Sequence, residues 1–141
     1  MSGAGRLYRQ VHPTHLKNGL SSGAFRPTPR DDDQLSVDCS QLISPEEAYE
    51  LHKQKTKIDR DGNPVALETA GTWAFTRDDC RAEGLNVVAD ASEGQPDQPD
   101  NPAHHLVDFS SIPGNPKRKN ENVSKRLRLS AEKIGQLWPQ N

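Results

Sequence analysis

The apolar residues of this sequence lie in short segments, and polar stretches over residues 26–34, 90–102 and 113–122 separate them. Leu, Ile, Val and Phe together account for 26 of the 141 residues. That number allows one small core and leaves no room for a second core of comparable size. We therefore expect a small folded domain with long irregular segments attached to it.

Charge is strongly segregated along the chain. The formal net charge of -2 is the sum of +5 over residues 1–30, -12 over residues 31–112 and +5 over residues 113–141. The basic ends could engage a polyanion while the acidic middle faces solvent. Alternatively, the ends could pack beside the middle and neutralise it within the fold.

Several short segments have the composition of strands. They are Leu7–Val11, Ser22–Phe25, Leu35–Asp38, parts of Val65–Phe75, Leu85–Ala89 and His104–Phe109. In the last of these, period-two alternation places Val107 and Phe109 on one face. The Asp61-Gly62 pair is typical of a hairpin turn between two further strands. These features predict an α+β fold with a small mixed or antiparallel sheet.

Two short helices have clear start signals. The series Ser44-Pro45-Glu46-Glu47 combines a capping serine, a proline at the first helical position and a glutamate three residues after the cap. It predicts a helix from Pro45 to about Lys55. The series Thr76-Arg77-Asp78-Asp79 predicts a second helix through Ala82, which Gly84 would end. A further helical turn is expected within 14–20.

The chain divides at its third polar stretch. We expect residues 1–112 to form the α+β domain, with a flexible, acidic, proline-rich loop over 90–102. Residues 113–141 would form a hinge over 113–116 and a basic amphipathic helix from roughly Glu121 to Ile134. The apolar stripe of this helix comprises Val123, Leu127, Ala131 and Ile134.

The basic side chains of the C-terminal helix are candidates for partner binding. They are Lys119, Arg126, Arg128 and Lys133. A helix with an apolar stripe and basic flanks can dock onto an acidic protein partner or onto the acidic face of its own domain. It can also contact phosphates of a nucleic acid, although no aromatic residue lies among the basic ones to stack on bases.

Metal sites are not indicated by the sequence. Residues 57–68 match several positions of a calcium-binding loop, but Lys57 stands where the first carboxylate is required. Five histidines are present, yet His104 and His105 are adjacent in a predicted strand and would point to opposite faces. We expect His12 to form local bonds at the end of its strand. We therefore predict neither a metal nor a cofactor.

A polar grouping could carry chemistry. Arginine and histidine can hold a phosphate, hydroxyl groups can hold a ribose, and an imidazole can act as a base. The candidates for such a pocket are Arg9, His12, Ser22, His104 and His105. This set predicts a nucleotide-using transferase or hydrolase, possible in a toxin or a defence system. The same residue types also occur on ordinary polar surfaces.

Four motifs carry a resemblance to known proteins. They are Arg9-x-x-His12-Pro13, Ser21-Ser22-x-Ala24-Phe25-Arg26-Pro27, Leu35-Ser36-Val37-Asp38 and Asn101-Pro102-Ala103-His104. The series, over roughly residues 7–109, resembles a group of small uncharacterised bacterial proteins. The resemblance implies a bacterial, cytoplasmic, stand-alone domain and implies no activity.

A fainter similarity is to small ADP-ribosyltransferase-type toxins. Those proteins place an Arg or His on a first strand, serines on a second strand and a catalytic Glu on a late strand. Arg9 or His12 and the pair Ser21-Ser22 match the first two features. The late glutamate is absent here, and Asp108 is the nearest substitute.

Features of the sequence also indicate the cellular compartment in which we expect the protein. The chain has no apolar run long enough to span a membrane and no secretory signal at its N-terminus. Cys39 and Cys80 match no zinc or disulfide pattern. These features favour the cytoplasm and no membrane partner.

The leading interpretation is a small binding module that engages a protein partner. The alternatives are a nucleotide-using enzyme and a nucleic-acid binder that uses the C-terminal helix. The sequence leaves open whether the protein is an enzyme.

Overall fold

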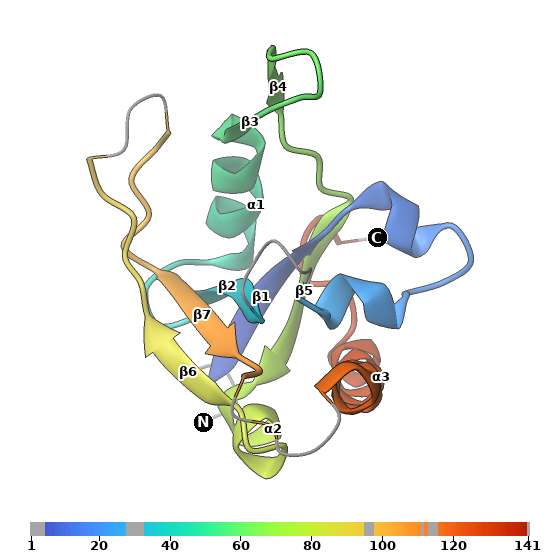
Figure 1. Ribbon diagram of the computed structural model, residues 1–141. Coiled ribbons are helices and arrows are strands. Elements are labelled where there is room, and N and C mark those ends of the chain that lie inside the picture. The colour runs from blue at the N-terminus through green and yellow to red at the C-terminus, as the bar shows by residue number, and fades with distance from the viewer. Residues whose placement is uncertain (1–4, 28–32, 95–97, 111, 113–115, 141) are drawn as a thin grey trace.

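A computed structural model describes residues 5–27, 33–94, 98–110, 112 and 116–140. Over these residues the fold is α+β, as predicted, with a five-stranded antiparallel sheet, a separate two-stranded hairpin and three α-helices (Figure 1). The strands of the main sheet follow the order β5-β1-β2-β7-β6. Their bounds are β1 (Arg6–Val11), β2 (Gln34–Cys39), β5 (Gly71–Thr76), β6 (Asn86–Ala89) and β7 (His104–Asp108).

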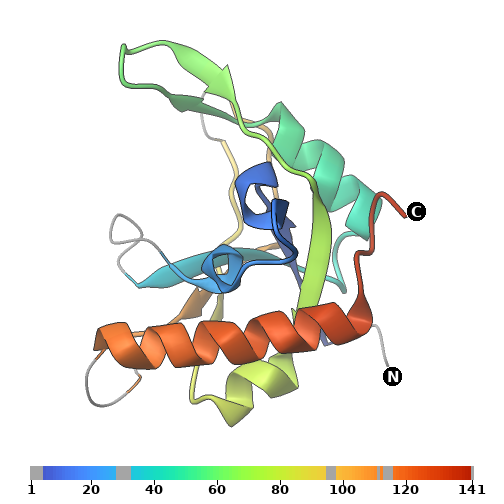
Figure 2. The ribbon, with the colours of Figure 1, turned by 90° about the vertical axis from the view of Figure 1, so that its right-hand side faces the viewer.

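The hairpin consists of β3 (Thr56–Ile58) and β4 (Pro64–Ala66). Its connection contains the predicted Asp61-Gly62 turn, and Gly62 has a φ of 83°, which a residue with a side chain rarely adopts. The Asp59 carboxylate closes the turn by accepting hydrogen bonds from the amides of Asp61 and Asn63, both at 2.9 Å. Figure 2 shows that the hairpin projects from the top of the molecule, away from the main sheet.

Both predicted helix starts are present, and each is a capping box. In α1 (Pro45–Gln54) the Ser44 hydroxyl accepts from the Glu47 amide and the Glu47 carboxylate accepts from the Ser44 amide, each at 3.1 Å. In α2 (Arg77–Ala82) Thr76 and Asp79 exchange the same pair of bonds. These reciprocal bonds satisfy amides that have no partner within a helix, so both starts are fixed locally.

The predicted strand over Ser22–Phe25 is wrong. These residues form a 3₁₀-helix, η2 (Ser22–Phe25), which follows another, η1 (Pro13–Leu16). The Ser21 hydroxyl accepts from the Gly23 amide at 3.1 Å and so starts the turn. A strand would direct Ala24 and Phe25 to opposite faces, whereas the turn buries both of them.

The C-terminal helix α3 (Pro116–Ile134) begins before the predicted Glu121. Its stripe is largely as predicted, because Val123, Leu127 and Ala131 are buried and Ile134 is half-buried. The helix packs against η2 and β5 across one face of the molecule (Figure 2). Apart from Pro116, the hinge predicted over 113–116 lies outside the described residues.

The sheet has a different core on each face. The larger core lies on the side of α3 and includes Phe25 and Phe75, whose ring centroids are 6.0 Å apart in an edge-to-face arrangement. Other fully buried members are Leu7, Val11, Leu35, Val107 and Leu127. The smaller core lies under α1 and consists of Tyr8, Ala48 and Ala74. Thus α3 completes the main core of the domain that precedes it.

Removing the buried side chain of Leu127 is predicted to destabilise the fold. Leu127 is 1% exposed, and a buried leucine replaced by alanine costs about 2–5 kcal/mol. Leu129 in the same helix is 50% exposed, so L129A is a matched control and should change stability by less than about 0.5 kcal/mol. Urea denaturation of both variants measures the difference. Equal effects would mean that α3 does not complete the core.

Candidate functional site

The sheet opens between β1 and β2, and Arg9 lies in this opening. The two strands pair at Leu7 with Cys39 and at Tyr8 with Asp38, whereas β1 pairs with β5 along its whole length. Beyond these pairs, Arg9 Nε donates to the Ala24 carbonyl at 2.8 Å and Nη1 donates to the Ser36 carbonyl at 2.9 Å. Both acceptors are backbone carbonyl oxygens from other segments of the chain, so these two bonds orient the guanidinium.

A cavity of about 450 Å³ lies beside this opening, where η1, the end of α1 and the hairpin meet. Two of its lining residues, Arg9 and Lys57, are permanently positive at neutral pH. Three histidines also line it: His12, His15 and His52. The one carboxylate among the lining residues is Glu68. We call this the basic cavity, because its cations and potential cations outnumber its acids.

His12 has both ring nitrogens engaged. Its Nδ1 accepts from the Thr14 amide at 3.1 Å and caps η1, which confirms the expected local role. Since Nδ1 is an acceptor, the neutral ring carries its proton on Nε2, which donates to Glu68 Oε2 at 3.0 Å. The hydrogen bond between His12 and Glu68 therefore links the end of β1 to the segment between β4 and β5.

The other two histidines of the basic cavity are held neutral. Burial and, to a smaller extent, the nearby cations Lys55 and Arg9 lower the pKa of His52 to about 4, against a hydrogen bond to the Glu68 backbone that raises it. Burial also lowers the pKa of His15, with contributions from His12, Arg9 and Arg26. A positive environment of this kind favours a bound anion, which would in turn favour the charged imidazoles.

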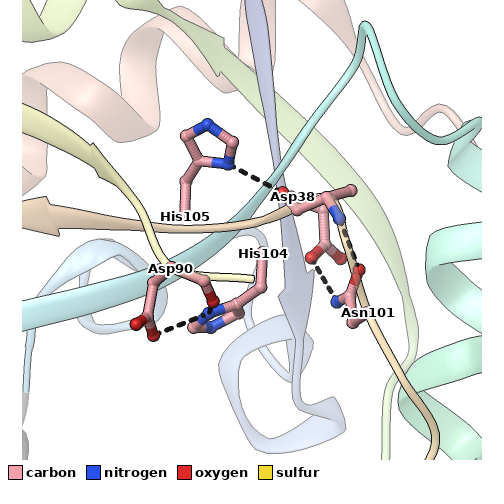
Figure 3. A network of polar contacts seen from close by, with 6 residues as sticks. Asp38, Asp90, Asn101, His104 and His105 are labelled. Carbon is pink, nitrogen blue, oxygen red and sulfur yellow. Dashed lines mark hydrogen bonds and ion pairs between the residues drawn. The ribbon is translucent and has the colours of Figure 1, made fainter. Parts of the chain in front are cut away.

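A second cavity of about 290 Å³ lies on the other side of Leu67, which lines both cavities. Here His104 Nδ1 is 2.9 Å from the Asp90 carbonyl oxygen and 3.1 Å from Asp90 Oδ2 (Figure 3). The His104 side chain is 16% exposed. The other lining residues are Lys55, Thr56, Ser92, Gln98 and Pro99. We call this the His104 cavity.

A buried polar pair joins the chain just before His104 to β2. Asn101 is fully buried, and its Nδ2 donates to Asp38 Oδ1 at 2.8 Å while its Oδ1 accepts from the Ala103 amide at 3.1 Å (Figure 3). Ser92 and Asn101 also exchange backbone hydrogen bonds of 3.0 and 2.6 Å. The described ends of the predicted loop 90–102 are therefore bonded to each other and to the sheet. Residues 95–97 of this loop lie outside the described residues.

The candidates from the sequence are divided among different places. Arg9 and His12 line the basic cavity and His104 lines the neighbouring one. His105 points to the opposite side of β7, as predicted, where it is buried and bonded to the Ala103 carbonyl at 2.8 Å (Figure 3). Ser22 begins η2 and lines neither cavity, and the pair Ser21-Ser22 is not on a strand.

Residue patterns in the sequence do not point to several of the lining residues. His52, Lys57, Glu68 and Asp90 come from α1, β3 and the segments that follow β4 and β6, and no local pattern predicts that they meet at these cavities. His15, in the last turn of η1, lines the basic cavity without such a pattern as well. The strand pattern did predict that the side chains of His104 and His105 point to opposite faces of the sheet. Of the two, His104 lines a cavity.

The basic residues of α3 are partly engaged within the protein. Arg126 donates two hydrogen bonds to Glu83, at 2.6 and 2.7 Å, and Arg128 pairs with Glu132 at 3.0 Å. Lys119 and Lys133 are exposed. The role of these four residues in partner binding remains a prediction.

Other types of site receive little support within the described residues. These residues contain no group of three or more His, Cys, Asp and Glu side chains placed to hold a metal ion. Cys39 and Cys80 are buried free thiols, and burial with nearby Asp79 raises the pKa of Cys80 to about 12. In the same part of the chain, no helix has the length and apolarity to cross a membrane.

Comparison of the chain with protein-family models, with curated proteins and with solved structures found no match. Function is therefore inferred from the geometry of the two cavities.

Neutral His52 makes the stability of the fold depend on pH. Its pKa is about 4 in the folded protein against 6.5 in the unfolded chain, so between these values the unfolded chain binds more protons. Stability is therefore expected to fall by at most about 3 kcal/mol as the pH drops from 6.5 to 4. The variant H52Q cannot charge and should lose this part of the dependence. Urea denaturation across this range measures it, and an unchanged slope in H52Q would contradict the assignment.

Proposed function

We propose that the protein binds a small phosphorylated ligand, of nucleotide class, in the basic cavity. The observation that carries the proposal is the set of charges among the described lining residues, where Arg9 and Lys57 are cations and Glu68 is the single acid. A cavity of about 450 Å³ falls within the size range of small-molecule sites, roughly 300–1,000 Å³.

The two cations suit a phosphate in different ways. The guanidinium of Arg9 is held in one orientation by two carbonyl groups, and a fixed planar guanidinium loses little freedom when it binds a phosphate. Lys57 lies on the exposed hairpin and adds a mobile point charge from the opposite wall. Neutral His15 and His52 supply imidazole groups that a bound anion would help to protonate.

A protein partner has less support from the fold than from the charge pattern of the sequence. The apolar stripe of α3 packs into the domain's own core, and Arg126 is paired with Glu83. A surface for a protein partner would have to use the remaining outward face of α3. The exposed Leu129 on that face is ordinary, since single apolar side chains are common on protein surfaces.

Binding is tested by thermal shift and calorimetry with inorganic phosphate, ribose phosphate and the nucleoside monophosphates. A ligand at 100 times its dissociation constant stabilises the fold by about 2.7 kcal/mol. The variant K57A should weaken binding about tenfold, because it removes one charge-assisted hydrogen bond of roughly 1.5 kcal/mol.

The matched control is R60A, which removes a positive charge from the same hairpin at an exposed residue that does not line the cavity. R60A should leave the affinity unchanged. If none of these compounds binds, or if K57A and R60A weaken binding equally, the basic cavity is not a phosphate site.

A further inference from the structure

The neutral His104 ring has its proton on one particular nitrogen. Nδ1 lies within hydrogen-bonding distance of two Asp90 oxygens, the backbone carbonyl and the carboxylate, and both of these can only accept. Nδ1 must therefore be the donor. The lone pair of the neutral ring is then on Nε2, so this nitrogen is able to take up a proton.

The position of His104 is fixed by backbone and side-chain contacts together. The Asp90 amide donates to the His104 carbonyl at 2.9 Å, so the two residues are held to each other by main chain as well as by the ring. A base that a carboxylate orients in this way is the arrangement that general-base catalysis uses.

His12 and His105 differ from His104 in this respect. In His12, Nδ1 accepts and Nε2 donates, so both nitrogens already have partners. His105 has its Nδ1 against the Ala103 carbonyl, but its ring is buried on the opposite side of the strand. His104 thus combines a carboxylate-bound Nδ1 with a place in the wall of a cavity.

The two cavities are neighbours. Leu67 lines both, so a ligand whose phosphate lies near Lys57 can extend past Leu67 toward His104. Lys55 lines the His104 cavity and brings a positive charge beside the base. A cation in that place suits the negative charge that a phosphoryl group carries in its transition state.

We propose that Asp90 and His104 form a general-base pair that hydrolyses a phosphodiester bond in a nucleotide-class ligand. The inference rests on the proposed function, because the basic cavity would hold that ligand. His104 is the catalytic base and Asp90 is the positioning residue that fixes its tautomer.

Hydrolysis proceeds by attack of a water molecule on the phosphorus atom. His104 Nε2 takes a proton from a water molecule, and the water oxygen forms a bond to phosphorus. The bond between phosphorus and the leaving oxygen breaks, and the imidazolium returns the proton to that oxygen. The products are an alcohol and a phosphate monoester, and the ring is again neutral with its proton on Nδ1.

Turnover is measured with thymidine 3′-phosphate 5′-(para-nitrophenyl phosphate), which has a terminal phosphate for the basic cavity and a phosphodiester for His104. Nitrophenolate leaves without a proton, so this probe isolates the general-base half of the step. The variant H104Q should lower kcat by at least about 100-fold, since general-base catalysis contributes roughly 10²–10⁴-fold. KM should stay within about twofold, and a thermal melt shows whether the variant is folded.

The variant K57A separates this inference from the proposed function. It should raise KM for the same probe and leave kcat unchanged. Two outcomes would refute the general-base pair and leave the binding proposal standing. In the first, K57A raises KM but H104Q retains the wild-type kcat. In the second, the wild-type protein binds nucleotides and does not turn over the probe. If H104Q abolishes turnover and K57A leaves KM unchanged, the phosphate assignment fails instead.

The positioning role of Asp90 has its own readout. Nitrogen–proton correlation spectra of the imidazole rings should show His104 with its proton on Nδ1 and His12 with its proton on Nε2. The variant D90N should shift His104 toward the form with its proton on Nε2 and lower kcat at least tenfold. The control D108N changes a residue that lies on the same strand as His104 and lines neither cavity, and it should do neither. A wild-type His104 protonated on Nε2, or equal effects of the two variants, would refute the pair.

Discussion

The short junction between β1 and β2 is the constraint on which the rest of the structure depends. In the described chain these strands pair at two positions only, Leu7 with Cys39 and Tyr8 with Asp38, although they lie at the centre of the sheet. Beyond the junction, Arg9 donates hydrogen bonds to the carbonyls of Ala24 and Ser36. A positive charge is thereby fixed at the place where the sheet opens.

The opening has consequences on both faces of the sheet. On the side of α3, η2 contributes Phe25 to the main core, and the helix packs against it. Beside the opening, η1 and the end of α1 bring three histidines toward Arg9, and the hairpin brings Lys57. A regular sheet would place side chains on its two faces and leave no cavity at its centre. The same irregularity therefore explains why a cavity exists and why it is basic.

Sequence alone predicted the features that local chemistry fixes. The helix starts at Ser44 and Thr76 need only four residues each, and the stripe of α3 needs only helical spacing. It failed at η2, where burial of both Ala24 and Phe25 outweighs the strand-like composition. It could not find the pair of Asp90 and His104, because that pair depends on the register of β6 against β7 and on tertiary packing. The same holds for His12 and Glu68, which are 56 residues apart.

The charge segregation along the chain is resolved at the level of individual pairs. Some cations of the basic ends neutralise acids, as Arg126 does with Glu83 and Arg26 with Glu121 at 3.7 Å. The cations of the two cavities come from both kinds of segment, since Arg9 belongs to the basic N-terminal end while Lys55 and Lys57 belong to the acidic middle. Net charge by segment therefore does not locate the site. What locates it is tertiary packing, which brings these cations to the same two cavities as Glu68 and Asp90, the acids that each bond to a histidine.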